Sequence, residues 1–294
     1  MTVVLKEILP VESCFRDYYA SMVDFGKQHL KNKKIVFSII TRNTAGRIKK
    51  NIESLIETVS SQHIKDYAVI VYENDSTDGT KDILSSMAKK DSKIHIRLED
   101  LNRVQYGPVK DLDRATRLAE YRSENQKLIK EKFYDFDYTI VVDSDFVEFS
   151  RDGVYNSFGF FDQHPTMIDA IAGNAFQIKT YPNGQKSLWN YDSWAFRDSW
   201  WDDLDLDPIP QVPQRMLWFG FWIPPVGSPI KKVNSAFGGM AIYKTGLYVE
   251  GVYGAKSYTG RLDLDHAVLH YSLHQQKKDF FLGLNPSQIM LMPD

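Results

Sequence analysis

The sequence predicts an α/β fold with a mostly parallel central sheet flanked by helices. Short apolar runs rich in β-branched residues alternate with longer segments whose apolar residues recur every three or four positions. Polar residues close each long apolar run at its carboxyl end. Strands that alternate with helices in this way are typical of a parallel sheet with helices on both faces. With 294 residues, of which 43% are hydrophobic, the chain is long enough to bury a large core.

The first half of the chain shows this alternation most clearly. After the first apolar run, apolar residues recur at helical spacing, which predicts a strand followed by a helix; they are Ile48, Ile52, Leu55, Ile56 and Val59. The same pattern then repeats along the chain. The expected strands are 35–40, 67–72, 94–98 and 138–142, and the expected helices run through 48–59, 83–87 and 111–132.

The second half is less regular. Residues 181–232 contain seven prolines and are expected to be rich in loops, and all six tryptophans lie between residues 189 and 222. The remaining expected elements are strands at 167–173, 240–243 and 280–284 and a helix that begins near residue 262. We expect residues 1–34 to form an N-terminal helical extension and residues 35–294 to form a single domain.

Composition excludes several classes of protein. The net charge is −2 and no long basic run occurs, so nucleic acid is not an expected partner. Cys14 is the only cysteine, which rules out an intrachain disulfide and fits a reducing compartment. No apolar stretch reaches the roughly 20 residues that span a bilayer, and the N-terminus lacks the pattern of a signal peptide. We therefore expect a soluble, cytoplasmic protein without a transmembrane segment.

The stretch 138–146 contains a pair of carboxylates that suggests a metal site. Its apolar run ends in Asp143, and Asp145 follows two residues later. Like charges this close repel and raise each other's pKa. A divalent cation resolves that conflict, and Mn²⁺ and Mg²⁺ both accept oxygen ligands. The alternative is a polar turn that simply closes a strand.

Other strands also end in polar residues. Arg42 follows the first expected strand and Glu73 follows the second. Right-handed crossovers bring these ends to one edge of a parallel sheet, where ligands of open α/β proteins bind. Neither a Gly-x-Gly-x-x-Gly nor a Gly-x-x-x-x-Gly-Lys motif follows the first strand. Dinucleotide-binding and P-loop folds are therefore disfavoured.

Five short motifs follow one another along the chain. They are 73–80 (Glu-Asn-Asp-Ser-Thr-Asp-Gly-Thr), 117–122 (Arg-Leu-Ala-Glu-Tyr-Arg), 142–145 (Val-Asp-Ser-Asp), 237–239 (Phe-Gly-Gly) and 265–266 (Asp-His). Together they resemble nucleotide-sugar glycosyltransferases of the GT-A fold. The first is similar to the acidic turn of family 2 transferases, and the second resembles a region of fungal capsule-associated mannosyltransferases. The chain departs from that group at Glu73 and at Ser123, and we expect it to lack the membrane anchor of the fungal relatives.

This resemblance implies a metal-dependent glycosyltransferase that moves a hexose from a nucleotide-diphosphate sugar, a GDP- or UDP-hexose, to a hydroxyl of a glycan acceptor. Residues 35–150 are then the nucleotide-binding half and residues 151–294 the acceptor-binding half, with the tryptophan-rich loops as the acceptor surface. The donor-binding residues that the resemblance implies are Thr41, Arg42, Glu73, Asp75, Arg117, Arg122, Ser144, Phe237, Gly238 and Gly239.

The resemblance also implies the catalytic and metal-binding residues. Asp143 and Asp145 hold Mn²⁺ or Mg²⁺, and His266 is the candidate third ligand. Asp265 is the candidate general base that takes the proton of the acceptor hydroxyl, with Asp263 as its substitute. A retaining enzyme needs neither as a base. For the histidines at 266, 270 and 274, which share one helical face, a solvated polar stripe is the alternative.

Two other functions remain open at this point. A sugar-phosphate nucleotidyltransferase shares the sheet and the metal, but it needs a glycine-rich basic loop after the first strand, which 41–44 (Thr-Arg-Asn-Thr) is not. A non-catalytic carbohydrate-binding protein uses the tryptophans and needs no metal at Asp143 and Asp145.

Overall fold

The computed structural model describes residues 5–107, 111–198 and 223–293. The chain divides into two compact units. Unit 1 comprises Met1–Leu30, Phe146–Ala241 and Asp279–Asp294, and unit 2 comprises Lys31–Asp145 and Ile242–Lys278. The boundaries predicted from sequence at residues 34 and 150 stay a prediction.

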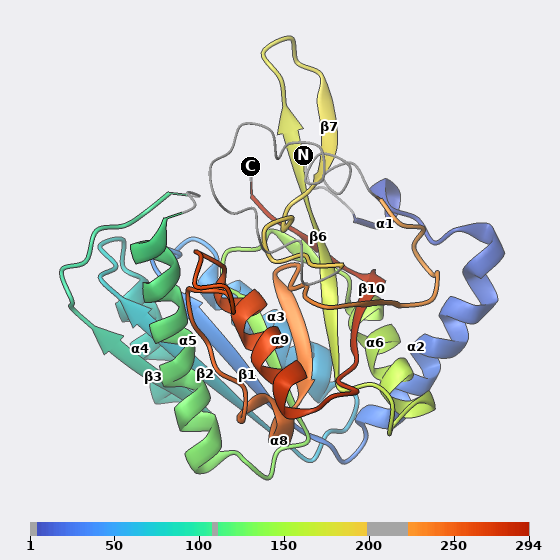
Figure 1. The fold of residues 1–294 in the computed structure, drawn as a ribbon, viewed down its shortest axis with the longest axis horizontal. Helices are drawn as coiled ribbons and strands as arrows, with labels where there is room; N and C mark the ends of the chain where they lie inside the picture. Colours follow the sequence, from blue (N-terminus) through green and yellow to red (C-terminus); the bar gives the residue numbers. More distant parts are fainter. Residues whose placement is uncertain (1–4, 108–110, 199–222, 294) are drawn as a thin grey trace. The chain divides into compact units, whose positions relative to one another are not determined.

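Unit 2 contains a parallel sheet in the order β3-β2-β1-β4 (Figure 1). Its strands are β1 (Lys34–Thr41), β2 (Asp66–Asn74), β3 (Ile94–Glu99) and β4 (Tyr138–Asp143), close to the predicted ranges. The central strands β1, β2 and β4 are buried along most of their length, as their mainly apolar sequences indicated.

The register of these strands determines which residues meet at the carboxyl edge of the sheet. Thr41 of β1 pairs with Glu73 of β2, and Ile40 of β1 pairs with Asp143 of β4. Asn74 of β2 pairs with Glu99 at the end of β3. The polar strand ends therefore lie side by side, as the sequence predicted.

The helices of unit 2 cover this sheet with their apolar faces. In α3 (Ile48–Ser60), four of the five residues predicted from their spacing are buried, and the fifth, Ile56, is half-buried. The helix α4 (Thr80–Lys90) follows β2, and α5 (Leu112–Lys132) begins where the Asp111 side chain accepts a hydrogen bond from the Arg114 amide. The unit also contains α8 (Thr245–Tyr248) and α9 (Asp265–Gln276).

Unit 1 is built on two long parallel strands, β6 (Ala170–Thr180) and β10 (Leu282–Leu291). β7 (Lys186–Asn190) forms a hairpin with β6, seen in yellow in Figure 1. β5 (Glu148–Phe149) and β8 (Lys231–Val233) pair antiparallel with β10. The strand β9 (Met240–Lys244) lies where the chain passes from unit 1 to unit 2.

Two helices of unit 1 pack against each other through glycines. These are α2 (Arg16–Leu30) and α6 (Arg151–Gln163). A Cβ on Gly26 would lie 1.7 Å from the Tyr155 carbonyl oxygen, and a Cβ on Gly159 would lie 2.0 Å from the Met22 carbonyl oxygen. The contact therefore requires glycine on both helices.

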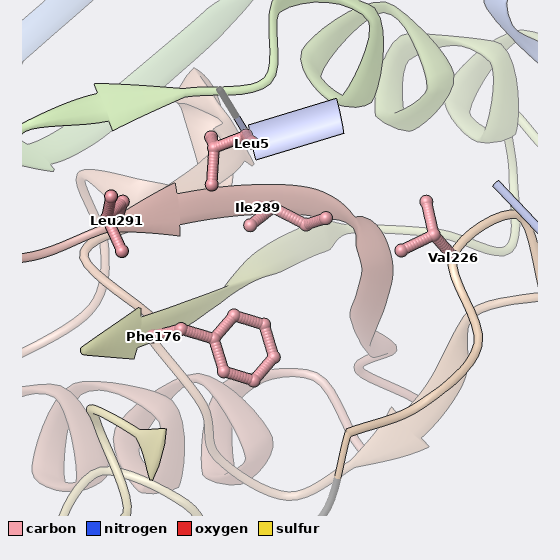
Figure 2. Close-up of a cluster of buried hydrophobic side chains, with 5 residues drawn as sticks. All are labelled: Leu5, Phe176, Val226, Ile289 and Leu291. Atoms are coloured by element: carbon pink, nitrogen blue, oxygen red, sulfur yellow. The ribbon is translucent and has the colours of Figure 1, made fainter. Parts of the chain in front are cut away.

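The N-terminal segment belongs to the core of unit 1. The first helix, α1 (Leu5–Ile8), is followed by the short 3₁₀ helix η1 (Ser13–Phe15). Figure 2 shows Leu5 of α1 gathered with side chains from β6, β10 and the segment before β8. The buried members of this cluster are Leu5, Phe176, Val226, Ile289 and Leu291.

Three features of unit 1 differ from the sequence prediction. The helix α6 was not predicted because Val154, Tyr155, Phe158 and Phe160 bury several of its sides, which removes the one-sided periodicity. The segment predicted to be loop-rich contains β7. The strand expected at 167–173 begins at residue 170 and runs to 180. Among the described residues, no helix is long and apolar enough to cross a membrane.

Candidate active site

Asp143 and Asp145 lie at the carboxyl end of β4. The Asp143 side chain is 22% exposed, and its Oδ1 accepts a hydrogen bond of 3.1 Å from Nη2 of Arg122. Burial raises the pKa of Asp143 to about 6; the Arg122 guanidinium lowers it and the Asp145 carboxylate raises it. Burial also raises the pKa of Asp145. Both carboxylates are thus held where ionisation is costly, and a further positive charge would stabilise them.

Two side chains hold the main chain at Ser144 and Asp145. The Ser144 carbonyl oxygen accepts a hydrogen bond of 2.9 Å from Nδ2 of Asn51, and Ser144 is buried. Nη1 of Arg47, at the start of α3, donates to the Asp145 carbonyl oxygen at 3.3 Å. Arg47 was not predicted as a site residue because no motif surrounds it, although it directly precedes α3.

Arg122 joins Asp143 to Asp265. Its Nε donates to Oδ2 of Asp265 at 2.6 Å, and its Nη2 donates to Asp143. Arg122 is 5% exposed and Asp265 is also buried. Of the two arginines in the 117–122 motif, Arg122 is the one that contacts Asp143.

The helix α5 positions Arg122 through its buried face. Ala115, Ala119, Arg122 and Asn125 recur every three or four residues and are all buried. Nδ2 of Asn125 donates to the Ile39 carbonyl oxygen at 2.9 Å, which ties the helix to β1. The guanidinium is therefore held on the side of α5 that faces the sheet.

Asp263 and His266 lie on either side of Asp265. Asp263 is 2% exposed, and its Oδ1 accepts a hydrogen bond of 2.7 Å from the Leu264 amide. Nε2 of His266 lies 4.0 Å from Oδ2 of Asp265. Burial lowers the pKa of His266 well below its usual value, so the imidazole is neutral at pH 7.

The alternative of a solvated histidine stripe is wrong for two of its three members. His266 is 2% exposed and His270 is fully buried, where its Nε2 makes a 2.8 Å hydrogen bond with the Tyr243 hydroxyl. Within the described ranges, no three His, Cys, Asp or Glu side chains are arranged to hold a metal ion. His266 as a third metal ligand therefore stays a prediction.

Of the strand-end residues assigned to the nucleotide, Glu73 and Thr41 contact residues three positions away, and Arg42 contacts the segment after β3. Glu73 is fully buried, and its Oε1 accepts a hydrogen bond of 2.8 Å from the Ser76 amide. Oγ1 of Thr41 lies 2.6 Å from Oγ1 of Thr44. Nη1 of Arg42 donates to the Arg103 carbonyl oxygen at 2.9 Å.

Asp75 and Arg117 both contact the segment after β3. Oδ1 of Asp75 accepts hydrogen bonds from the Leu101 and Asn102 amides. Nη1 of Arg117 donates to the Val104 carbonyl oxygen at 3.2 Å, and its Nη2 pairs with Asp113 at 2.6 Å. Arg117 thus contacts the segment after β3, whereas Arg122 contacts Asp143 and Asp265. No motif marked residues 101–106 in the sequence.

Phe237, Gly238 and Gly239 lie in unit 1. Gly238 has φ +59°, and a Cβ there would lie 2.2 Å from the Gly173 carbonyl oxygen of β6. A Cβ on Gly239 would lie 2.6 Å from Sδ of Met290 on β10. Packing within unit 1 accounts for both glycines, and their contact with a donor sugar stays a prediction.

Two of the six tryptophans lie among the described residues. Trp189 on β7 has Nζ of Lys179 over its ring at 4.6 Å, and the Trp194 carbonyl oxygen accepts a hydrogen bond of 2.7 Å from Arg197. Trp200, Trp201, Trp218 and Trp222 lie outside the described residues. The acceptor role of this region stays a prediction.

Comparison with known proteins gives one family match. A protein-family model described as Glycosyl transferase family 2 matches residues 37–210, more than half of the chain. No curated protein sequence matches the chain.

Solved structures are similar at low sequence identity. One is GalNAc-T7 with UDP, GalNAc and Mn²⁺, with a TM-score of 0.53 and 12% identity over 89% of this chain and 44% of that chain. Another is a mannosyltransferase from Pyrobaculum calidifontis in complex with GDP-Man and Mn²⁺, with a TM-score of 0.46 and 13% identity over 95% of this chain and 65% of that chain. A third is glucosyl-3-phosphoglycerate synthase from Mycobacterium tuberculosis, with a TM-score of 0.45 and 14% identity over 97% and 79%. The first likeness shows a shared fold.

Proposed function

This chain belongs to glycosyl transferase family 2 and has the GT-A fold, and on that premise we propose that it is a metal-dependent glycosyltransferase. It moves a hexose from a nucleotide-diphosphate sugar to a hydroxyl of a glycan. The family disfavours both a sugar-phosphate nucleotidyltransferase and a non-catalytic carbohydrate-binding protein.

The observation that carries this proposal is the charge arrangement at the carboxyl edge of the unit 2 sheet. Asp143 and Asp145 end β4, and Arg122 joins Asp143 to Asp265. Ligands of open α/β sheets bind beyond this edge. Asp143 and Asp145 therefore stand at the edge of the sheet where such a ligand would bind.

The two carboxylates fit a divalent cation. They offer oxygen ligands, and the pKa of Asp143, raised to about 6 by burial, indicates that its ionised form lacks sufficient positive charge nearby. Mg²⁺ is commonly bound by one or two carboxylates together with substrate phosphates and water, so a third protein ligand is not required. When bound, the cation would neutralise the charge of the departing nucleoside diphosphate.

Residues of unit 2 then bind the donor. We assign Thr41, Arg42, Glu73 and Ser144 to the nucleotide-diphosphate side of the site, because their strand ends or turns share one edge with Asp143. Phe237, Gly238 and Gly239 are assigned to the donor sugar on the resemblance alone. The base of the nucleotide is left to experiment, with UDP and GDP as the candidates.

Asp265 is the proposed general base of an inverting reaction. The acceptor hydroxyl oxygen forms a bond to the anomeric carbon, the bond from that carbon to the diphosphate oxygen breaks, and the hydroxyl proton passes to the Asp265 carboxylate. The hydrogen bond from Arg122 at 2.6 Å fixes the orientation of that carboxylate. Asp263 is the substitute, although one of its oxygens already accepts the Leu264 amide. A retaining reaction requires neither.

Thermal melting with metal and nucleotide tests this function. Mn²⁺ with UDP or GDP should raise the melting temperature of the wild-type protein, since a ligand at 100 times its Kd stabilises by about 2.7 kcal/mol. Asp145→Asn should lose that rise and lose sugar transfer. Asp135→Asn is the matched control, because Asp135 is exposed and pairs with Lys34.

Two outcomes contradict the proposal. If neither nucleotide raises the melting temperature of the wild-type protein with Mn²⁺ present, the transferase function loses its support. If Asp145→Asn keeps metal-dependent transfer, the metal role of that carboxylate is wrong. The anomeric configuration of the product separates inverting from retaining transfer.

A further inference from the structure

The segment 101–106, which we call the β3 loop, follows β3 at the carboxyl edge of the unit 2 sheet. β3 ends at Glu99, which pairs with Asn74 at the end of β2 (Figure 1). The loop therefore begins beside the strand ends to which a nucleotide was assigned. No residue of this loop was predicted to be functional.

The Asp75 carboxylate organises the start of the β3 loop. Its Oδ1 accepts hydrogen bonds from the amides of Leu101 at 2.6 Å and Asn102 at 2.7 Å. Its Oδ2 accepts from the Arg103 amide at 3.2 Å and from Nδ2 of Asn74 at 2.9 Å. An ionised carboxylate has about four lone-pair positions. Four donors therefore occupy the acceptor capacity that a nucleotide contact would need.

Two further side chains hold the rest of the loop. Nη1 of Arg117, on α5, donates to the Val104 carbonyl oxygen at 3.2 Å, and its guanidinium lies 5.3 Å from the Tyr106 ring centre. Nδ2 of Asn43, after β1, donates to Oε1 of Gln105 at 2.6 Å. The β3 loop is thus attached to β1, β2 and α5 by side-chain hydrogen bonds.

The loop exposes apolar side chains while its backbone is held. Val104 is 67% exposed and Leu101 is 37% exposed. Exposed apolar side chains on a fixed backbone form a surface that suits the flat, largely apolar face of a nucleotide base. Phosphate groups gain nothing from such a surface.

We propose that Asp75 and Arg117 are positioning residues that hold the β3 loop as the wall contacting the nucleoside of the donor. Neither residue then contacts the nucleotide itself; Leu101 and Val104 do. This inference rests on the proposed function, and it replaces the direct contacts that the resemblance implied for Asp75 and Arg117.

Binding measurements separate positioning from direct contact. The Kd of UDP, GDP and pyrophosphate is measured calorimetrically with Mn²⁺ for the wild type, Asp75→Asn and Arg117→Met. Loss of hydrogen bonds to a charged group should raise the Kd of the preferred nucleotide about 10-fold in both variants. The Kd of pyrophosphate, which has no nucleoside, should stay within about 2-fold.

A second measurement reports on the loop itself. Trypsin cleaves after Arg103, whose amide and carbonyl groups are both held in the folded protein. Cleavage at this bond should be about 10-fold faster in Asp75→Asn, as expected for loss of a charge-assisted contact. Asp78→Asn is the matched control: Asp78 also accepts backbone amides, at Ala45 and Thr80, but none from the β3 loop. Cleavage after Arg103 should be unchanged in that variant.

The outcomes are distinct. If the wild type binds neither nucleotide with Mn²⁺, the proposed function fails. If the wild type binds and Arg117→Met weakens pyrophosphate as much as the nucleotide, Arg117 contacts the diphosphate and the inference is wrong for it. If Asp75→Asn binds the nucleotide more weakly but is cleaved after Arg103 at the wild-type rate, Asp75 contacts the nucleotide directly and the inference is wrong for Asp75. Arg117→Met tests the loop independently if Asp75→Asn does not fold.

Discussion

Replacement of Arg122 by methionine should strongly destabilise the protein at pH 7. The guanidinium pairs with two buried or partly buried carboxylates, at 2.6 Å to Asp265 and 3.1 Å to Asp143. Methionine keeps the apolar stem and removes the charge. Removal of one partner from a buried ion pair costs about 3–5 kcal/mol, because the other charge stays buried without compensation. At 2–4 °C per kcal/mol, the melting temperature should fall by about 6–20 °C.

The size of this effect should depend on pH. Burial already raises the pKa of Asp143 to about 6, and loss of the Arg122 guanidinium raises it further. An acid whose pKa is higher in the folded state destabilises the fold when it ionises, and the lost stability returns as the pH falls through that pKa. The difference between Arg122→Met and the wild type should therefore be smaller at pH 5 than at pH 7.

Urea unfolding and thermal melting at both pH values test this reasoning, with Arg97→Met as the control. Arg97 also pairs with two carboxylates, Glu99 and Glu124, but its side chain is 51% exposed. Exposed pairs contribute about 1 kcal/mol or less. If Arg122→Met costs no more than Arg97→Met at pH 7, or if its deficit grows at pH 5, the argument from the buried triad is refuted.

Three other predictions follow from the same structure. Gly238→Ala should lower the free energy of unfolding by about 3 kcal/mol or more, measured in urea, because φ is +59° and a Cβ would meet the Gly173 carbonyl oxygen at 2.2 Å. The control Gly184→Ala, with φ +81° and open space around it, should lower it by about 1 kcal/mol. Equal losses would contradict the packing argument. Burial lowers the pKa of His270 to about 3 from 6.5, so only the unfolded chain binds its proton between these values and stability falls as the pH drops below 6.5. His270→Phe should reduce that slope, by up to about 1.4 kcal/mol per pH unit as the pH approaches 5, measured by urea unfolding between pH 6.5 and 5; an unchanged slope would show that His270 does not titrate as described. EDTA should abolish the rise in melting temperature that UDP or GDP gives with Mn²⁺ while leaving the nucleotide-free melting temperature unchanged, and a rise that persists in EDTA would separate nucleotide binding from the metal.

Local patterns in the sequence were sufficient to predict the parallel sheet of unit 2 and the position of Asp143 and Asp145 at the end of one of its strands. The strands β1, β2 and β4 are mainly apolar runs, and α3 shows one buried face at helical spacing. Such patterns report how neighbouring residues along the chain are buried. They also place Asp143 at a strand end, since the run stops there.

Local patterns fail where a helix is buried on several sides or where a glycine serves a distant contact. The helix α6 lacks a polar face along much of its length, so its periodicity is lost. The motif marked Gly238 as special, but it gave no sign that the absent Cβ leaves room for the Gly173 carbonyl oxygen; the donor-sugar contact stays a prediction. The residue type was correctly marked as special, but its neighbour lies 65 positions earlier in the chain.

The sequence did not predict which charged side chains bind one another; the fold is needed for that. The motif 117–122 offered two arginines, and the register of α5 on β1 directs Arg122 to carboxylates 21 and 143 positions away while Arg117 reaches the β3 loop. Asp75 binds three amides that lie 26 to 28 positions later. The order of apolar and polar residues along the chain specifies the sheet, its polar edge and the residue types gathered there. The pairing of those residues depends on strand register and helix rotation, because a charged side chain binds whichever partner the packed backbone brings within a few ångströms.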